Sequence, residues 1–304
     1  MKVLVTGASG FVGQEVLEKL HAAGHQSRIL ARHPTSMRTR TQASEFGAEV
    51  HAGDILDVAS LARGLKGIDA VIHLVGIISE LGESTFENIH IRGAENVVDA
   101  ARIAGVRRFV HMSAMGTRAN ASSRYHKTKW AAEEYVRKSG LDYTIFRPSI
   151  IYGPKDLFVN LFAKISQLSP IMPVMGNGQS KLQPIPVSDV ATCFVKALTE
   201  PASLGQTYEL GGRDVLTLEQ VIDEILLATN RRRLKVHIPL SIARSQASLL
   251  EFAYPRLLGK APPLNHDQLI MLQEDNIGDS EPANKLFRLQ PISFRQGISA
   301  YLKK

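Results

Sequence analysis

The chain of 304 residues contains a single cysteine, Cys193. No disulfide bond can therefore form within the chain, which suits a reducing compartment. Cys193 lies in an apolar stretch with helical spacing at 190–198, and we expect it to be a small buried core residue.

The chain also lacks a long hydrophobic run. No apolar segment approaches the roughly 20 residues that cross a bilayer as a helix. The first apolar strand is expected at residues 3–6, which leaves no room before it for a secretory or transit peptide. We therefore expect a cytoplasmic protein, and we expect no metal site.

The hydrophobic residues that are present, 44% of the chain, are ample for a buried core. Short apolar runs alternate with segments of helical spacing, such as residues 88–104, which is typical of a parallel sheet covered by helices on both faces. The sequence therefore predicts an α/β fold with a doubly wound (Rossmann) sheet and a smaller C-terminal lobe. Strands are expected at 3–6, 27–31, 49–52, 70–75, 109–112 and 143–146.

The pattern loosens after Pro154 into stretches that contain proline and glycine. Thr217 and Gln220 form a capping box before a further helix. Later elements are expected at 188–198 (helix), 207–210 (strand) and 221–228 (helix). We assign residues 1–153 and about 184–210 to the Rossmann domain, and about 154–183 and 211–304 to a smaller lobe that binds a substrate or a partner.

Residues 6–13, TGASGFVG, follow the first strand directly and open an amphipathic helix. In such a unit the first glycine allows the tight turn, the second lets a pyrophosphate approach the backbone, and the third lets the helix pack on its strand. The amide groups and dipole of the helix start attract phosphates. An ordinary strand-to-helix turn is the alternative. The predicted dinucleotide site comprises Gly7, Ser9, Gly10, Phe11, Val12 and Gly13.

Tyr125 and Lys129 lie four residues apart on an expected helix, so both can face one ligand. A phenol is a poor proton donor or acceptor near neutral pH unless a nearby cation favours its anion, and Lys129 supplies that charge. Lys129 can also hold the ribose of a nicotinamide cofactor while Tyr125 exchanges a proton with a substrate oxygen. A solvated pair on a helix face is the alternative.

Further motifs follow the expected strands in order: GDI at 53–55, HLVG at 73–76, FVHMSA at 109–114 and RPSIIYGP at 147–154. With the glycine turn and the Tyr125–Lys129 pair, they resemble an extended or atypical short-chain dehydrogenase/reductase. Within that group the chain is most similar to the branch of the nucleotide-binding accessory subunit of respiratory complex I and its bacterial relatives. Segments 85–94 and 267–276 carry that second likeness.

The resemblance implies more cofactor contacts at the carboxyl ends of the strands. They are Asp54 and Ile55 at the adenine, Leu74, Val75 and Gly76 at the ribose near the nicotinamide, and Pro148 and Ile150 on the carboxamide side.

Two positions depart from the family pattern. Ala114 stands where extended members carry a substrate-orienting Ser or Thr, and His90 stands where they usually carry Asn. Either Ser113 substitutes as a catalytic residue or the end of its strand is merely structural. We expect His90 to be a packed histidine rather than an acid or base.

The second expected strand ends without an acid to accept the ribose hydroxyls of NAD(H), and Arg32, Arg38 and Arg40 follow it. We therefore predict NADP(H) in preference to NAD(H), with Arg32 binding the 2′-phosphate. A solvated surface arginine is the alternative.

The net charge is +7, and residues 231–260 carry seven Lys and Arg against one acid, Glu251. This segment also has apolar residues at helical spacing, interrupted by Pro255. It either packs as a lobe helix with a solvated basic rim, which we favour, or makes peripheral contact with an anionic membrane. No recognition motif or aromatic platform accompanies the charge, so we expect no nucleic-acid binding.

These features predict an NADP(H)-binding oxidoreductase or epimerase-type enzyme that acts on a small alcohol or carbonyl compound, with Tyr125, Lys129 and Ser113 as catalytic candidates. If residues 231–260 meet the inner membrane surface, a lipid- or quinone-related substrate follows. The main alternative is a non-catalytic NADPH-binding accessory or assembly protein of a respiratory or quinone-biosynthesis complex, which Ala114 favours. A redox-sensing regulator is a third hypothesis.

Overall fold

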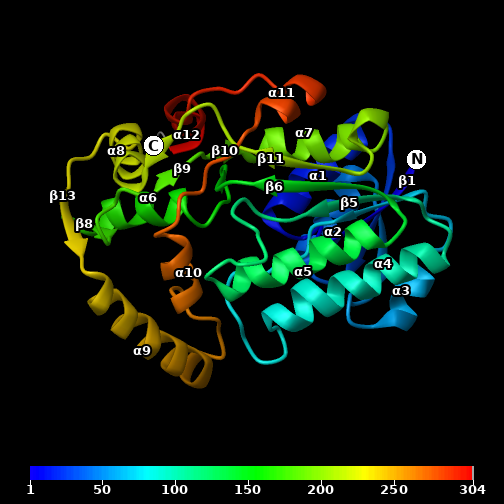
Figure 1. The fold of residues 1–304 in the computed structure, drawn as a ribbon, viewed down its shortest axis with the longest axis horizontal. Coiled ribbons are helices and arrows are strands. Elements are labelled where there is room, and N and C mark those ends of the chain that lie inside the picture. The colour runs from blue at the N-terminus through cyan, green and yellow to red at the C-terminus, as the bar shows by residue number, and fades with distance from the viewer. Residues whose placement is uncertain (303–304) are drawn as a thin grey trace.

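A parallel sheet forms the centre of the computed structural model, which describes residues 1–302 (Figure 1). Its strands are β1 (Lys2–Thr6), β2 (Gln26–Ala31), β3 (Glu49–Ala52), β4 (Ala70–His73), β5 (Arg108–Met112), β6 (Asp142–Pro148) and β11 (Gln206–Leu210). They follow the order β11-β6-β5-β4-β1-β2-β3, and every neighbouring pair is parallel. The winding reverses between β1 and β4, where open sheets of this kind bind ligands. The predicted doubly wound α/β fold is confirmed.

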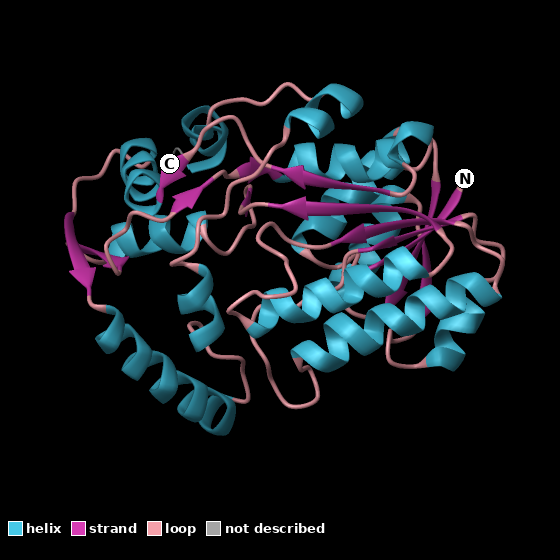
Figure 2. Ribbon diagram, viewed as in Figure 1, coloured by secondary structure: helices cyan, strands magenta, loops and turns pink. Residues whose placement is uncertain are grey.

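Helices cover both faces of this sheet (Figures 1 and 2). One face carries α1 (Phe11–Ala22), α2 (Met37–Phe46), α7 (Val187–Ala197) and α11 (Glu281–Phe287), and the other carries α3 (Val58–Gly64), α4 (Gly93–Ile103) and α5 (Arg124–Lys138). In β1, Val3 and Val5 enter the first core and Leu4 the second. Successive side chains of a strand point to opposite faces, so a strand buried on both sides is apolar throughout.

Two predicted elements differ in the structure. β4 ends at His73, two residues before the predicted end. The predicted helix at 88–104 is divided into a π-helix, Glu87–Arg92, and α4, which begins at Gly93. A π-turn changes the hydrogen bonding over one turn without disturbing the apolar spacing of the helix that follows, so the sequence pattern does not reveal it.

The smaller lobe has its own apolar core, to which α6, β8, α8 and α12 contribute. Its elements are β7 (Ile151–Tyr152), α6 (Val159–Leu168), β8 (Ile171–Met175), β9 (Lys181–Leu182), β12 (Leu216–Thr217), α8 (Leu218–Ala228), β13 (Leu234–Ile238) and α12 (Phe294–Leu302). β10 (Ile185–Pro186) and η2 (Pro201–Ser203) belong to the main domain: Ile185 enters the core beneath α1 and α7, and the carbonyl oxygen of Ser203 accepts the hydroxyl of Thr144 in β6. The predicted capping box is confirmed, because the side chains of Thr217 and Gln220 each accept the backbone N–H of the other.

One segment assigned to the smaller lobe from the sequence packs elsewhere. Ala283 and Phe287 of α11 belong to the core beneath α1 and α7. The Phe287 ring lies 5.5 Å from the rings of both Phe146 and Tyr208. Residues 211–304 therefore contribute to both parts of the molecule.

Two helices, α9 (Leu240–Leu258) and α10 (His266–Met271), follow β13 and lie along one side of the molecule (Figure 1). Pro255 lies in the last turn of α9, which continues through it. Within residues 1–302, every helix is too short or too polar to cross a bilayer.

Candidate active site at the carboxyl edge of the sheet

The glycine turn joins β1 to α1 where the winding of the sheet reverses. Gly7 has a φ of +76°, in the left-handed region that favours glycine, and its carbonyl oxygen accepts the N–H of Gly10 at 2.9 Å. Gly10 is the N-cap of α1 and has no side chain to cap the first amide groups of the helix. Those amides are therefore available to an anion, as a pyrophosphate requires.

The start of α1 also packs tightly on this turn. A Cβ on Gly13 would lie 2.5 Å from the carbonyl oxygen of Ala8, which no packed structure tolerates. Ser9 is exposed and Phe11 is half-buried, whereas Val12 is buried and can meet a ligand only through its backbone. The backbone of this turn is free of large side chains and therefore fits the pyrophosphate of a dinucleotide.

Residues beyond β4 lie beside the glycine turn. A Cβ on Gly7 would be 3.1 Å from the carbonyl carbon of Leu74. Leu74 is buried, Val75 is half-buried and Gly76 is exposed. A Cβ on Gly76 would be 3.2 Å from Nζ of Lys129. The structure thus brings the glycine turn, this segment and the predicted lysine together.

The other cofactor contacts that the family resemblance implies lie in the segments after β3 and at the end of β6. The carboxylate of Asp54 accepts the N–H of Leu56 at 2.9 Å, and Ile55 is buried. Pro148 is buried at the end of β6, while Ile150 is half-buried against the core of the smaller lobe.

Arg32 directly follows β2 and is exposed, as are Arg38 and Arg40. Among residues 1–302, none of these three arginines forms an ion pair with an acid. Their guanidinium groups are therefore available to an added phosphate.

Lys129 lies on α5, which begins after the capping residue Ser123. Its Nζ donates to the carbonyl oxygen of Met112, the last residue of β5, at 2.9 Å. The side chain is 2% exposed. Burial lowers the pKa of Lys129 to about 8, although the carboxylate of Glu133 acts in the opposite direction.

Tyr125 packs edge-on against His90, with ring centroids 5.2 Å apart, and against Phe86 at 5.9 Å. Within the described residues its hydroxyl forms no hydrogen bond. Burial raises the pKa of Tyr125 to about 12. In this state the cost of desolvating a phenolate dominates the pKa of Tyr125, and the support that Lys129 gives to the anion stays a prediction. Tyr125 is a protonated phenol, and the raised pKa makes it a weaker acid than a free phenol, although still a stronger acid than an alcohol.

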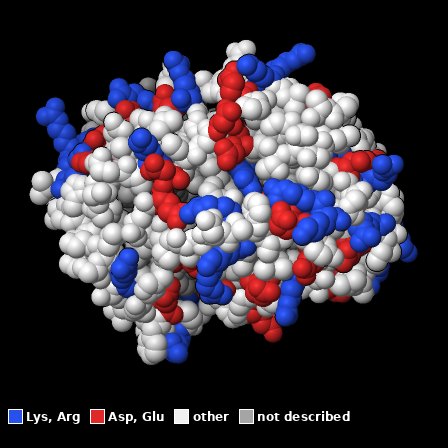
Figure 3. Space-filling view, in the orientation of Figure 1, with Lys and Arg blue, Asp and Glu red and all other residues white. Residues whose placement is uncertain are grey.

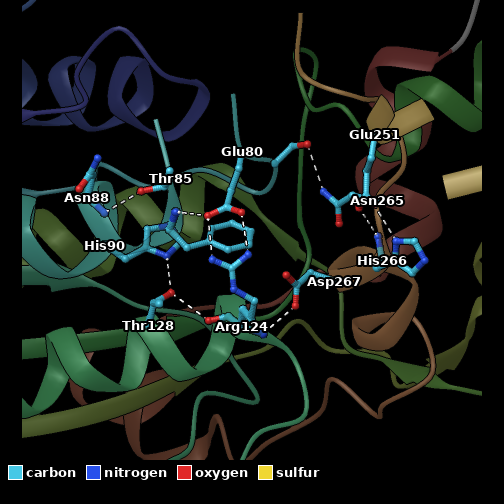
Figure 4. Close-up of polar contacts among 12 residues, drawn as sticks. Glu80, Thr85, Asn88, His90, Arg124, Thr128, Glu251, Asn265, His266 and Asp267 are labelled. Carbon is cyan, nitrogen blue, oxygen red and sulfur yellow. Dashed lines mark hydrogen bonds and ion pairs between the residues drawn. The ribbon is translucent and has the colours of Figure 1, made fainter. Parts of the chain in front are cut away.

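His90 connects the segment beyond β4 to the turn of α5 that carries Tyr125 (Figure 4). The N–H of Ile77 donates to Nε2 of His90 at 3.1 Å, so Nε2 is unprotonated. Nδ1 then carries the proton and donates to Oγ1 of Thr128 at 2.9 Å, and that hydroxyl donates to the carbonyl oxygen of Tyr125 at 3.0 Å. Burial lowers the pKa of His90 to about 2. His90 is a neutral packing group, as the sequence indicated.

Ser113 and Ala114 follow β5. The Ser113 hydroxyl is buried and donates to Oγ1 of Thr117 at 3.4 Å, and that oxygen lies 3.4 Å from Nδ1 of His126. Ala114 is half-buried. These contacts favour the structural interpretation of Ser113 over the catalytic one.

Two buried histidines beneath the site were not predicted from the sequence. His73 of β4 and His111 of β5 stack with ring centroids 5.4 Å apart. Nδ1 of His73 lies 2.7 Å from the hydroxyl of Thr6, whereas both ring nitrogens of His111 are buried without a partner among residues 1–302. Burial and the nearby charge of Lys129 lower both pKa values, that of His73 to about 3. A polar residue inside each apolar strand was the available signal.

Comparison with known proteins gives three findings. A family described as NAD(P)H-binding matches residues 7–201. The chain is 30% identical to NADH dehydrogenase (ubiquinone) 1 alpha subcomplex subunit 9, mitochondrial, of Arabidopsis thaliana, over 90% of this chain and 68% of that protein. It is 32% identical to the ceramide reductase of Caulobacter vibrioides, over 66% of this chain and 61% of that protein. The chain spans about two thirds of the length of such relatives.

Solved structures agree on the fold. UDP-glucose 4-epimerase from Thermotoga maritima superposes with a TM-score of 0.76 over 99% of this chain and 97% of that one. The two sequences are only 19% identical, so this likeness concerns the fold alone.

Proposed function

The chain belongs to the NAD(P)H-binding family, and from this premise we propose that it is an NADP(H)-dependent oxidoreductase that reduces the carbonyl group of a lipid-like compound. The likeness to extended short-chain dehydrogenases/reductases and to complex I accessory subunits, first drawn from the motifs, is confirmed. The observation that carries the proposal is the position of Lys129, whose Nζ would lie 3.2 Å from a Cβ on Gly76 in the segment that borders the glycine turn, with Tyr125 one helical turn before it on α5. The ceramide reductase relative supports a lipid-like substrate.

The proposed reaction divides the work among a few side chains. NADPH bound at the glycine turn would supply the hydride that the carbonyl carbon accepts. Tyr125 donates its hydroxyl proton to the substrate oxygen. The ammonium group of Lys129, held by the carbonyl oxygen of Met112, stabilises the phenolate that remains. His90 keeps the Tyr125 ring and the segment at Ile77 in fixed positions.

Transfer of label from the cofactor tests this proposal. The full chain is incubated with NADPH that carries deuterium at C4 and with a panel of long-chain ketones, β-keto esters and quinones. We expect mass spectrometry to find deuterium on the alcohol carbon of at least one product. NADPH that binds tightly but transfers no label to any member of the panel would contradict the proposal.

That contrary result is what the second candidate function predicts. We infer a non-catalytic, NADPH-binding accessory protein of a respiratory complex as the alternative, because Ala114 offers no hydroxyl to orient a substrate and relatives include complex I subunits. The two candidates share the cofactor site and differ only in turnover, so label transfer separates them.

We further propose that NADPH is preferred over NADH and that Arg32 determines the preference. Arg32→Ala should weaken NADPH binding about 10- to 100-fold, because a charge-assisted contact to the 2′-phosphate is lost. NADH binding should change less than about threefold. Isothermal titration with both cofactors measures this, and Arg28→Ala, which removes a guanidinium from the interior of β2, is the control. Equal losses for NADPH and NADH in Arg32→Ala would contradict the assignment.

We also propose a cytoplasmic location with peripheral contact at the inner membrane surface through residues 231–260. The support is the basic and apolar composition of that segment.

A further inference from the structure

Helix α9 exposes its large apolar side chains and buries its small ones. Over Leu240–Leu258 only Ala243 and Ala247 are buried. Leu249 is 66% exposed and Phe252 is 60% exposed. The exposed apolar residues, which we call the α9 face, are Ile242, Leu249, Phe252, Leu257 and Leu258.

Most of the α9 face forms a single stripe. Ile242, Leu249 and Phe252 are separated by seven and three residues, a spacing that places them on the same side of a helix. Ala243 and Ala247 lie on the side that packs against the protein, with Leu269 of α10. The packing of α9 therefore does not account for its largest side chains, and large apolar side chains exposed along one side of a helix indicate a contact surface.

The charges around the α9 face are basic. Arg244, Arg256 and Lys260 form no ion pair with an acid among residues 1–302, and the Arg256 guanidinium stacks on the Phe252 ring at 3.9 Å. The only acid of α9, Glu251, accepts hydrogen bonds from the backbone N–H of His266 and lies 2.8 Å from its Nδ1. Figure 3 shows that the corner of the molecule over α9 is largely uncharged, with a few separate basic and acidic side chains.

We propose that the α9 face binds the surface of an anionic lipid bilayer. Leucine, isoleucine and phenylalanine on the stripe enter the boundary between headgroups and acyl chains, while the flanking cations bind anionic headgroups. A bilayer accounts for both the exposed apolar side chains and the flanking cations of this surface. A protein partner would need an acid opposite each of three separate cations, whereas anionic lipids can diffuse to them.

Residues at the start of α10 connect α9 to the proposed active site (Figure 4). Glu251 of α9 contacts His266, and the neighbours of His266 contact residues beside Tyr125. Asn265 donates to the carbonyl oxygen of Ile78 at 2.9 Å, and Asp267 accepts the N–H of Arg124 at 2.6 Å. The Arg124 guanidinium in turn pairs with Glu80 at 2.8 Å. Tyr125 directly follows Arg124, so a protein docked by the α9 face holds the proposed site near the bilayer. This consequence rests on the proposed enzyme activity, whereas the docking rests only on the proposed membrane contact of residues 231–260.

Sedimentation of the full chain with vesicles tests the docking, without cofactor or substrate. We expect binding to vesicles with 30% phosphatidylglycerol at least tenfold stronger than to pure phosphatidylcholine, and weaker as salt rises from 0.1 to 0.5 M. Leu249→Ser/Phe252→Ser should lower binding at least tenfold, because the apolar insertion is lost. Arg256→Gln/Lys260→Gln should reduce the preference for anionic lipid.

The matched control is Ile103→Ser/Leu168→Ser, which makes the same kind of change at exposed residues of α4 and the end of α6. It should bind vesicles like the wild type, and thermal unfolding should show that all variants are folded. Absence of vesicle binding, equal binding to both lipids, or equal loss in the control overturns the proposal. A dimer that Leu249→Ser/Phe252→Ser abolishes, without vesicle binding, would instead assign the α9 face to a second copy. Because no reaction is measured, failure of the enzyme proposal leaves these outcomes unchanged.

Discussion

Tyr125→Phe should lower kcat for carbonyl reduction about 10²- to 10⁴-fold, the usual contribution of a positioned proton donor. The Tyr125 hydroxyl is protonated at neutral pH, as an ordinary phenol is, and it is the proposed source of the proton for the substrate oxygen. Single-turnover oxidation of NADPH, followed by its absorbance, measures the effect. The dissociation constant for NADPH should change less than about threefold, because only the hydroxyl oxygen is removed.

Tyr125→Phe should remove the proton donor without changing the stability of the fold. Within residues 1–302 the Tyr125 hydroxyl forms no hydrogen bond, and the ring keeps its edge contacts with His90 and Phe86. Tyr135→Phe is the matched control on the same helix: it removes a hydroxyl that donates to Asp99 at 2.8 Å, and it should leave kcat unchanged. A Tyr125→Phe enzyme with wild-type kcat would exclude Tyr125 as the proton donor.

Acid should unfold the protein well above the pH at which most carboxylates are protonated. His73, His90, His111 and His126 are each buried as neutral rings, and burial lowers their pKa values, to about 3 for His73, about 2 for His90 and about 4 for His126. The unfolded chain takes up these protons near pH 6.5, so unfolding binds protons and the free energy of unfolding falls as pH drops below 6.5.

The expected loss is large. Each histidine contributes about 1.4 kcal/mol per pH unit, so four lose on the order of 10 kcal/mol between pH 6.5 and 4.5. That is comparable to the whole stability of a typical domain. Urea unfolding at a series of pH values, followed by circular dichroism, measures it.

His111 offers a direct check of this cause. Both of its ring nitrogens are buried without a partner in the described chain, so His111→Leu should keep or raise stability at pH 7. The same variant should reduce the slope below pH 6.5 by about 1.4 kcal/mol per pH unit. The exposed His33 gives the control, since His33→Gln should leave the slope unchanged. An unchanged slope in His111→Leu would show that other groups cause the acid sensitivity.

The sequence by itself determined the doubly wound sheet and the glycine turn at which the cofactor site is proposed. Local rules decide both: a strand buried on two faces must be apolar at every position, and a close turn beneath a helix start needs glycine at positions such as Gly7 and Gly13. The capping box of Thr217 is local for the same reason, because its partners lie three residues apart. Periodicity therefore reported these features correctly.

Only the tertiary structure decided the protonation of the site and the exposure of α9. The pKa of Tyr125 depends on how much water the surrounding chain removes, and that outweighs the four-residue spacing to Lys129. His73 and His111 meet only because β4 and β5 pair across a long separation in sequence. The apolar spacing of α9 indicated a helix that packs on a pocket, yet the folded chain buries only its alanines. Burial is a property of the assembled fold, whereas spacing is a property of one element.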